Sequence, residues 1–486
     1  MTRYPLEPDG DAFRAMADEV IDRLAPLIDR MQQTPYWDWP TRLDERARAH
    51  EPLREPLPDA GIPLGDALNT LFHDVYPFSF AAASPGFVAY IPAGGLPSAA
   101  LAQLIAAVFN AYPTIWHAGP AVAQIELTVL RWFAAMVGFP PDAHGYLASG
   151  GSMSGFSALI TARKKKLPEN FLAGTIYSSD QSHFWIHKAA LLAGFPQDNV
   201  RLVPTDERQR MRVDVLREMI EADRAAGRQP FFVSATAGTV HTGAVDDMAA
   251  IADVCADTTT GAGCWMHVDA AYGGFFMLTA RGREILRGID RADSITLDPH
   301  KGLFLPYGVG GLLVKDRAAL RAAHSVGGGK YIPDMQDNDD RFDATDVSPE
   351  LTRGFRALQV WLPLKLHGAA AFVAQLDEKL DLAQRFADGL RDIPFVRLID
   401  EPQLSLVGFR LELPGLNDEF LDRVNQELIE RVLQRGRFHM SGTWVNGRFV
   451  CRMCVLGFRT HAAQIDQGLE DIREVASRLC GYIPII

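Results

Sequence analysis

The sequence predicts an open α/β fold, with a large domain built on a mostly parallel sheet and a small α/β domain at the C-terminus. Short apolar runs alternate with helical patterns through the middle of the chain, and strand–helix alternation is typical of parallel βαβ units. Near Ala371 the pattern changes to a long charged helix, two strands and a closing amphipathic helix. A chain of 486 residues is also longer than one compact core usually holds.

The N-terminal segment is predicted to be an amphipathic helix, because apolar residues recur at three- and four-residue steps from Phe13 to Met31. A polar, proline-rich linker follows from Thr34 to about Gly65. We therefore divide the chain into an N-terminal helical segment over 1–90, a large domain over 91–370 and a small domain over 371–486.

The elements of the large domain follow from local patterns. Helical periodicity covers 121–139, 212–226 and 246–257, and strands are predicted at 175–180, 200–204, 230–238, 264–270 and 294–298. The small domain has strands near 407–413 and 449–458, and a closing helix whose apolar face includes Ile465 and Val475. Ligands of open parallel sheets bind beyond the carboxyl ends of the strands, so polar residues after each strand are the candidates for function.

The charge balance argues against nucleic acid or an anionic membrane as a partner. Lys plus Arg number 48 and Asp plus Glu number 60, giving a net charge of -12. From Val75 to Ile125 the chain carries no Asp, Glu, Lys or Arg, but six prolines interrupt it, so no apolar run of ~20 residues could span a bilayer. This charge-free stretch is predicted to form a subunit interface, a pocket wall or plain core.

The cysteines favour a reducing, cytoplasmic location. There are five, an odd and small number, and the N-terminal MTRYPLEPDGD lacks an apolar signal core. Cys451 and Cys454 form a C-x-x-C, but they lie in a predicted strand without a second ligand pair, so we expect no metal site.

Several chemically active residues follow predicted strands. His183 follows one in SSDQSHFW, Asp269 and Ala271 end another in WMHVDAAYGG, and Lys301 ends a third in LDPHKG. The glycine- and serine-rich ASGGSMSGFSALITA runs directly into a helix. Taken singly, each has a structural explanation, since Ser and Asp often cap helices and most histidines are structural.

Together these residues match the needs of pyridoxal 5'-phosphate (PLP). Its aldehyde needs a lysine amine, and its pyridine nitrogen needs a carboxylate that keeps it protonated. Its phosphate needs backbone N–H groups and hydroxyls at a helix N-terminus. Its flat ring needs a stacking partner on one face and a small residue on the other.

On these motifs the chain resembles the group II PLP-dependent amino-acid decarboxylases, the family of aromatic-L-amino-acid, histidine and glutamate decarboxylases. The resemblance extends over nearly the whole length, through SPGFVAYIP, GGSMSGFSAL, SDQSH, HVDAAYGG, DPHKG and LTRGFRALQVWLPLKLHG. It implies the PLP-dependent transferase fold type I (aspartate-aminotransferase-like) and decarboxylation of an L-amino acid to an amine. Aromatic substrates are favoured, and methionine, leucine or valine stay open.

The resemblance also implies a role for each site residue. Lys301 would hold the cofactor covalently, Asp269 would pair with its ring nitrogen, and His183 would stack on the ring with Ala271 beneath it. The phosphate would be held by Gly151, Ser152, Ser154 and His300. The substrate mouth would be lined by Pro85, Phe87 and Tyr90. The family is homodimeric, with the charge-free stretch at the interface and the N-terminal helix packed on the partner subunit.

The sequence departs from the family at a few positions. Asp298 stands where relatives often carry Asn, Gly302 where animal aromatic decarboxylases carry tryptophan, and Ala93 where they carry threonine. Relatives carry a proton-donating tyrosine on a closing loop, here expected over 327–346. Tyr331 is our candidate, although Phe342 falls nearer the expected position. Phe342 there would favour an aldehyde synthase, and a non-catalytic PLP-binding scaffold is the third alternative.

Overall fold

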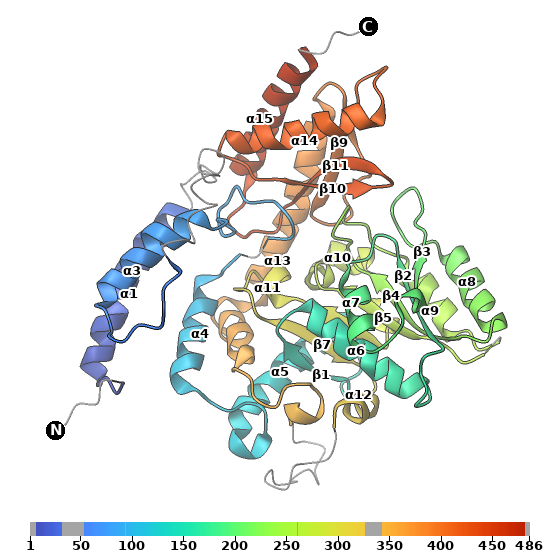
Figure 1. The fold of residues 1–486 in the computed structure, drawn as a ribbon, viewed down its shortest axis with the longest axis horizontal. Helices are drawn as coiled ribbons and strands as arrows, with labels where there is room; N and C mark the ends of the chain where they lie inside the picture. The colour runs from blue at the N-terminus through green and yellow to red at the C-terminus, as the bar shows by residue number, and fades with distance from the viewer. Residues whose placement is uncertain (1–5, 32–52, 93, 260, 326–342, 482–486) are drawn as a thin grey trace.

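Two sheets organise the chain, one in each predicted domain (Figure 1). The computed structural model of the protein describes residues 6–31, 53–92, 94–259, 261–325 and 343–481. The larger sheet has the strand order β1-β7-β6-β5-β4-β2-β3. Its strands are β1 (His144–Ala148), β2 (Gly174–Ser179), β3 (Val200–Val203), β4 (Gln229–Thr236), β5 (Trp265–Ala270), β6 (Ser294–Leu297) and β7 (Gly310–Val314).

The large sheet is parallel except at β7, which pairs antiparallel with both β1 and β6. The order of β6, β5, β4 and β2 brings their carboxyl ends to one edge. Its strands are apolar and buried because helices pack on the sheet. These helices are α5 (Pro120–Val137), α6 (Gly151–Lys166), α7 (Trp185–Leu192), α8 (Val213–Ala225), α9 (Met248–Ala256) and α12 (Arg317–His324). The short α10 (Ala280–Ile285) packs instead against the 3-10 segment Gly274–Leu278.

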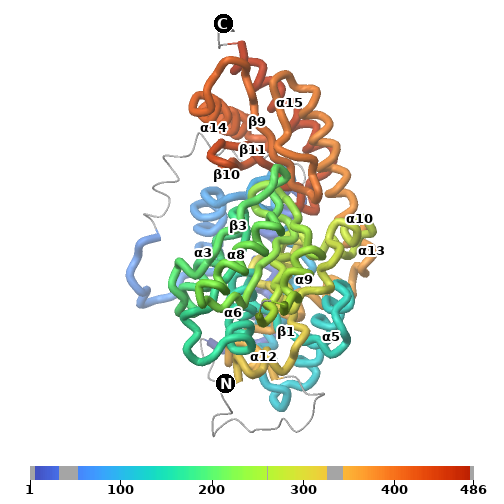
Figure 2. Tube along the Cα trace, turned by 90° about the vertical axis from the view of Figure 1, so that its right-hand side faces the viewer, coloured from blue at the N-terminus to red at the C-terminus, as the bar shows by residue number. Residues whose placement is uncertain are grey.

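The small domain stacks on one end of the large one (Figure 2). Its antiparallel sheet has the order β10-β11-β9-β8, with β8 (Val396–Leu398), β9 (Leu406–Leu411), β10 (Ser441–Val445) and β11 (Arg448–Cys454). It packs on α14 (Asp418–Gln434), α15 (Ala462–Gly481) and the end of α13 (Arg356–Arg391). Gly368 interrupts α13 at φ 73°, three residues before our predicted domain boundary at 371.

The segment before the large domain joins the small sheet. The N–H of Val88 donates to the carbonyl of His439, and the N–H of Cys454 donates to the carbonyl of Val88. Val88, which we assigned to the N-terminal segment, is therefore held beside β11 of the small domain. This arrangement brings Tyr90 and β11 together.

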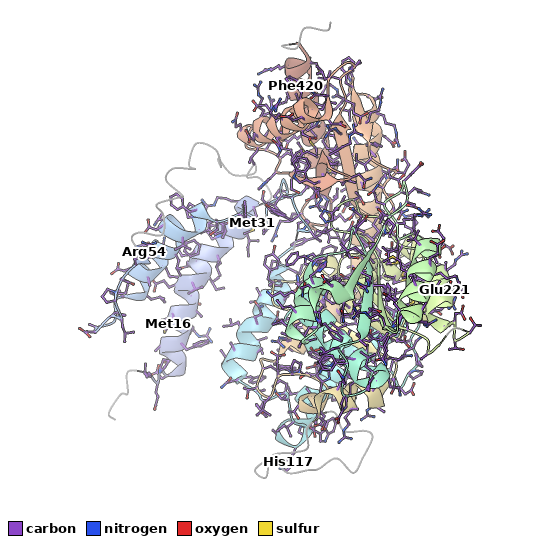
Figure 3. All side chains as sticks on the ribbon, turned by 45° about the vertical axis from the view of Figure 1, so that its right-hand side comes forward. Met16, Met31, Arg54, His117, Glu221 and Phe420 are labelled. Atoms are coloured by element: carbon purple, nitrogen blue, oxygen red, sulfur yellow. The ribbon has the colours of Figure 1, made fainter. Side chains whose placement is uncertain are left out.

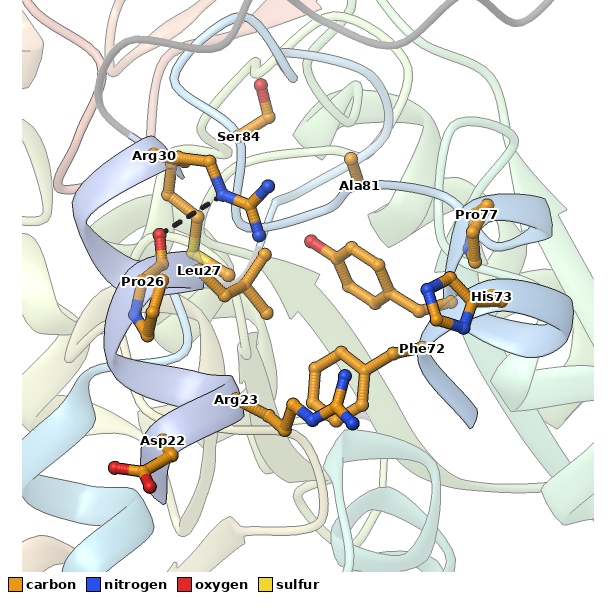
Figure 4. Close-up of a pocket in the computed structure, with 12 residues that line it drawn as sticks. Asp22, Arg23, Pro26, Leu27, Arg30, Phe72, His73, Pro77, Ala81 and Ser84 are labelled. Atoms are coloured by element: carbon orange, nitrogen blue, oxygen red, sulfur yellow. Dashed lines mark hydrogen bonds between the residues drawn. The ribbon is translucent and has the colours of Figure 1, made fainter. Parts of the chain in front are cut away.

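The N-terminal helix α1 (Gly10–Met31) lies beside α3 (Leu64–Thr70), apart from the large sheet (Figures 1 and 3). None of its residues is buried, although its sequence is amphipathic. A cavity of about 410 Å³ lies between α1 and residues 72–84, where Arg23 and Arg30 extend from α1 (Figure 4). None of the predicted site residues lines this cavity.

The predicted helices and strands are found, and the misses have physical causes. β1, β7, β8 and β10 were not predicted, because HGYLA, GGLLV and SGTWV are short and contain glycine, and β8 has only three residues. The charge-free stretch contains α4 (Pro97–Phe109), which we did not predict because of its prolines; Pro97 opens the helix, where proline is tolerated.

Two structural expectations concern metals and membranes. Cys451 and Cys454 are three residues apart on β11, so their side chains leave opposite faces of the strand, and the described residues contain no group of potential metal ligands. Two helices, α5 and α13, are long and apolar enough to cross a bilayer by length and composition. In the structure α5 packs against β1 and carries the buried Glu126, which is paired with Arg353 at 2.8 Å.

Candidate active site

A cavity of about 800 Å³ opens at the carboxyl ends of β4, β5 and β6, beside the first turn of α6. Most of the predicted site residues line it although they come from distant parts of the chain. They are Tyr90, Gly151, Ser152, His183, Asp269, Ala271, His300 and Lys301. The edge of a parallel sheet thus gathers the polar groups, as the strand-end argument predicts.

Lys301 lies on the single-turn helix α11 (Pro299–Gly302), directly after β6. Its Nζ is 3.1 Å from Oδ2 of Asp298, whose side chain is only 2% exposed. His300 Nε2 is 3.7 Å from the same oxygen, and His300 Nδ1 is held by the carbonyl of Val309 at 2.6 Å. Oδ1 of Asp298 is buried without a hydrogen-bond partner among the described residues.

The start of α6 is suited to a phosphate. The first N–H groups of a helix have no intrahelical acceptor, and the helix dipole favours an anion there. A Cβ on Gly151 would lie 3.0 Å from Oδ2 of Asp298 and 3.2 Å from Cβ of Ala271, so glycine keeps this turn close to the sheet. Ser152 lines the cavity, but Ser154 is buried within α6 and its hydroxyl donates to the carbonyl of Gly150.

The carboxylate of Asp269 is held by two donors at the end of β5. The indole N–H of Trp185 donates to Oδ2 at 2.7 Å, and the N–H of Ala271 donates to Oδ1 at 3.2 Å. Because an ionised carboxylate can accept about four hydrogen bonds, this group retains capacity for a protonated ring nitrogen. Together with the lysine and the helix start, this donor set fits PLP.

His183 lines the same cavity as this carboxylate. Its pKa is lowered by burial and by Lys301, while Asp269 and Asp298 oppose the shift, so the ring is neutral at pH 7. The backbone N–H of Trp185 donates to Nδ1 at 3.1 Å. Because Nδ1 accepts a hydrogen bond, the neutral ring carries its proton on Nε2.

The predicted substrate mouth is only partly assembled in this cavity. Tyr90 lines it in a left-handed conformation, φ 53°, in which its N–H donates to Ser441 Oγ and its carbonyl accepts from Arg452. Phe87 instead packs edge-on against His439, with ring centroids 5.1 Å apart, and is buried. Pro85 does not line the cavity either, and its carbonyl accepts a hydrogen bond from Thr460.

The remaining predictions have different outcomes. Tyr331, Phe342 and Ala93 lie outside the described residues. At Gly302, an added Cβ would lie 2.7 Å from Cβ of Phe275, so glycine is needed there for packing on Phe275.

Four further residues line the cavity that the motifs did not predict: Trp185, Thr236, His241 and Tyr272. The signal for Trp185 was its place two residues after His183, and the signal for Thr236 was its place at the end of β4. Aromatic and hydroxyl residues are common beside strands, so neither signal was specific. The hydroxyl of Thr236 is buried and has no hydrogen-bond partner among the described residues.

The chain is similar to known proteins over nearly its whole length. The pyridoxal-dependent decarboxylase conserved domain matches residues 56–412. An aromatic-L-amino-acid decarboxylase from Bacillus atrophaeus is 34% identical over 483 residues, 99% of each chain. A phenylacetaldehyde synthase from Petunia hybrida is 27% identical over 494 residues, 97% of this chain and 95% of that protein. A crystal structure of Oryza sativa TDC with PLP and tryptamine has a TM-score of 0.91 at 27% identity, covering 98% of this chain and 100% of the other.

Proposed function

Because the chain belongs to the pyridoxal-dependent decarboxylase family, we propose that it converts an aromatic L-amino acid to the corresponding amine and carbon dioxide. The protein is a PLP-dependent carboxy-lyase acting on an amino acid, and its mixed, mostly parallel sheet is that of fold type I. The observation that carries the proposal is the convergence of Lys301, Asp269 and His183 on one cavity at the sheet edge.

Each residue has a defined task in this proposal. Bound PLP supplies an electron sink for the electron pair that remains when the carboxyl group leaves as carbon dioxide. Lys301 anchors the cofactor from the rigid end of β6, and Asp269 keeps the ring nitrogen protonated by its negative charge. His183, which carries its proton on Nε2, lines the cavity, and the first turn of α6 holds the phosphate.

The lining of the cavity supports an aromatic side chain as substrate. Apolar and aromatic residues make up much of the wall: Tyr90, Ile91, Met153, Phe184, Val240 and Tyr272. Flat apolar surfaces favour aromatic ligands through stacking and edge-to-face contacts. The name of the Bacillus atrophaeus relative supports the same class.

A substrate panel tests this proposal. The purified PLP-loaded enzyme is given tryptophan, tyrosine, phenylalanine, methionine, leucine and valine separately, and carbon dioxide and amine are measured. We expect kcat/KM for the best aromatic substrate to exceed that for every aliphatic one by at least ~10-fold, the effect of about 1.4 kcal/mol in transition-state binding. A higher value for methionine, leucine or valine would assign the cavity to aliphatic substrates.

Aldehyde formation is the second candidate. The similarity to a phenylacetaldehyde synthase favours it, because that protein matches this chain over 97% of its length. In this reaction the amino acid, oxygen and water give aldehyde, carbon dioxide, ammonia and hydrogen peroxide. A positioned proton donor suppresses it, and we assign that role to Tyr331.

We also propose that the protein is a homodimer. Five apolar residues at helical spacing form one exposed face of α4, namely Leu101, Leu104, Ile105, Val108 and Phe109. Phe109 is 74% exposed, and a contiguous apolar face of this size is typical of an interface. None of the residues of α1 is buried although the helix is amphipathic, which supports the prediction that this helix packs on the partner subunit.

Light scattering after size exclusion tests the dimer. The wild type should elute at twice the chain mass of 53.5 kDa, and Val108→Asp should shift it toward the monomer. Leu172→Asp, at an exposed leucine outside this face, is the matched control and should stay dimeric. A wild-type monomer would contradict the proposal.

For the cellular location and the partners of the enzyme we keep the expectation from the sequence. We propose a cytoplasmic protein without nucleic-acid or membrane partners, supported by the net charge of -12 and by five cysteines that form no disulfide.

A further inference from the structure

We propose that Trp185 is a positioning residue that controls where the proton between Asp269 and the cofactor resides. Its indole N–H stabilises the ionised carboxylate of Asp269, so the proton stays on the pyridine nitrogen. The inference rests on the proposed binding of PLP in this cavity. It assigns a role to a residue that received none from the sequence motifs.

The first support is that hydrogen bonds, rather than a basic side chain, stabilise the negative charge of Asp269. This carboxylate is 9% exposed, and in the described part of the chain it forms no ion pair with a basic side chain. Its only hydrogen-bond donors there are the Trp185 indole and the Ala271 N–H. A buried charge without a counterion depends on its hydrogen bonds, and the Trp185 contact at 2.7 Å is the shorter of the two.

The second support is that the indole is fixed in place. A Cβ on Gly155 of α6 would lie 2.5 Å from ring atom Cζ3 of Trp185, so the glycine leaves room for the ring. The ring of His267 packs edge-on against the indole of Trp185, with ring centroids 5.6 Å apart at an interplanar angle of 77°. His267 is itself held by Ser294, Nδ1 to Oγ 2.9 Å. The donor therefore has little freedom to leave Asp269.

His267 adds no competing charge. Burial lowers its pKa to about 4, so it is neutral at pH 7 and provides packing without a cation. The side chain that stabilises the negative charge of Asp269 is thus the indole of Trp185, through its N–H dipole.

The third support is that the same residue also orients His183. The backbone N–H of Trp185 donates to Nδ1 of His183, while its side chain donates to Asp269. The group expected on the ring face and the group expected at the ring nitrogen are therefore fixed by one residue at the start of α7.

The proposed effect of Trp185 is on the position of one proton. Asp269 and the pyridine nitrogen share one proton, and a donor that binds the charged carboxylate lowers its affinity for that proton. Without the indole N–H the carboxylate becomes more basic, the proton moves from nitrogen toward oxygen, and the electron sink weakens. Hydrogen bonds to charged groups contribute enough to change this balance by ~10- to 100-fold.

The test uses PLP labelled with ¹⁵N at the ring nitrogen, bound to the full-length protein. In Trp185→Phe the ¹⁵N shift should move toward that of unprotonated pyridine, and kcat should fall by ~10- to 100-fold. Trp361→Phe is the control, because it removes a partly buried indole on α13, whereas Asp269 accepts only from Trp185 and Ala271 among the described residues. The control should keep the wild-type shift.

A second replacement separates the hydrogen bond from packing. Benzothienylalanine at position 185 keeps the bicyclic shape and replaces the N–H by sulfur, so a folded protein is expected even where Trp185→Phe is unstable. It should give the same displaced ¹⁵N shift. A wild-type shift with this residue would overturn the proposal and leave Trp185 a packing residue. Equal displacement in the Trp361→Phe control would also overturn it. Failure of the wild type to bind PLP or release carbon dioxide would instead refute the proposed function.

Discussion

Lys301 and the buried Asp298 form an ion pair, 3.1 Å from Nζ to Oδ2, in the lining of the cavity. The second oxygen of Asp298 has no partner among the described residues, and the carboxyl group lies against Gly151 at the start of α6 and Gly310 at the start of β7. The negative charge of Asp298 therefore lies beside the proposed phosphate site, and Lys301 is its counterion.

This arrangement predicts that Asp298→Asn binds PLP more tightly. The substitution removes a like charge near the phosphate and provides an amide donor, so the dissociation constant should fall at least ~10-fold, as ~1.4 kcal/mol of relieved repulsion requires. Equilibrium dialysis measures it. Asp180→Asn removes an exposed carboxylate at the end of β2 and controls for net charge. Equal or weaker binding by Asp298→Asn would show that its charge does not oppose the phosphate.

Asp269→Asn should retain cofactor and lose most activity. The amide keeps the size of the side chain and can hydrogen-bond, but it lacks the charge that holds the ring nitrogen protonated. Removing a charge partner that acts in the transition state costs a few kcal/mol, so decarboxylation should fall at least ~100-fold. Initial rates of carbon dioxide release at saturating PLP measure the effect. Activity near that of the wild type would remove Asp269 from its assigned role.

The pH profile should report His183. Its pKa is lowered from 6.5 by burial and by Lys301, against the opposing charges of Asp269 and Asp298, so the ring gains a proton only as the pH falls below 6.5. Protonation would end the acceptor role of Nδ1 toward Trp185. We expect an acid limb of kcat/KM below pH 6.5 that is absent in His183→Gln.

His241→Gln is the control for this profile. His241 also lines the cavity, and its pKa is also lowered by burial, with Arg452 and His183 adding to the shift. Its replacement should leave the acid limb in place. Loss of the limb in His241→Gln and its retention in His183→Gln would transfer the titration to His241.

Product balance tests the role of Tyr331. If its hydroxyl delivers the proton to Cα, the wild type makes amine, and Tyr331→Phe shifts the products toward aldehyde and hydrogen peroxide while carbon dioxide release continues. A positioned donor is typically worth ~10² to 10⁴ in rate. Aldehyde and peroxide from the wild type would favour the synthase instead. Clean amine from Tyr331→Phe at the wild-type rate would assign the proton to another group.

The sequence was sufficient to predict the site residues that are recognised from their neighbours in the chain. Lys301, Asp269 and His183 stand directly after strands, and parallel strands bring such positions to one edge. It was not sufficient for contacts that depend on tertiary packing. Trp185 and Asp269 are 84 residues apart, and Tyr90 and Arg452 are 362 apart. Neither tryptophan nor arginine carries a local signal for such a partner. That Phe87 does not line the cavity could not be predicted for the same reason, since its burial against His439 depends on the small domain.

Borohydride reduction followed by peptide mapping tests the central assignment, that Lys301 carries the cofactor, most directly. Reduction should fix PLP to the protein, and trypsin cannot cut after a modified lysine, so the label should appear on the peptide of residues 292–315, which contains Lys301. Lys301→Ala should lose both the label and turnover. A label on any other peptide, or full turnover in Lys301→Ala, would contradict the assignment.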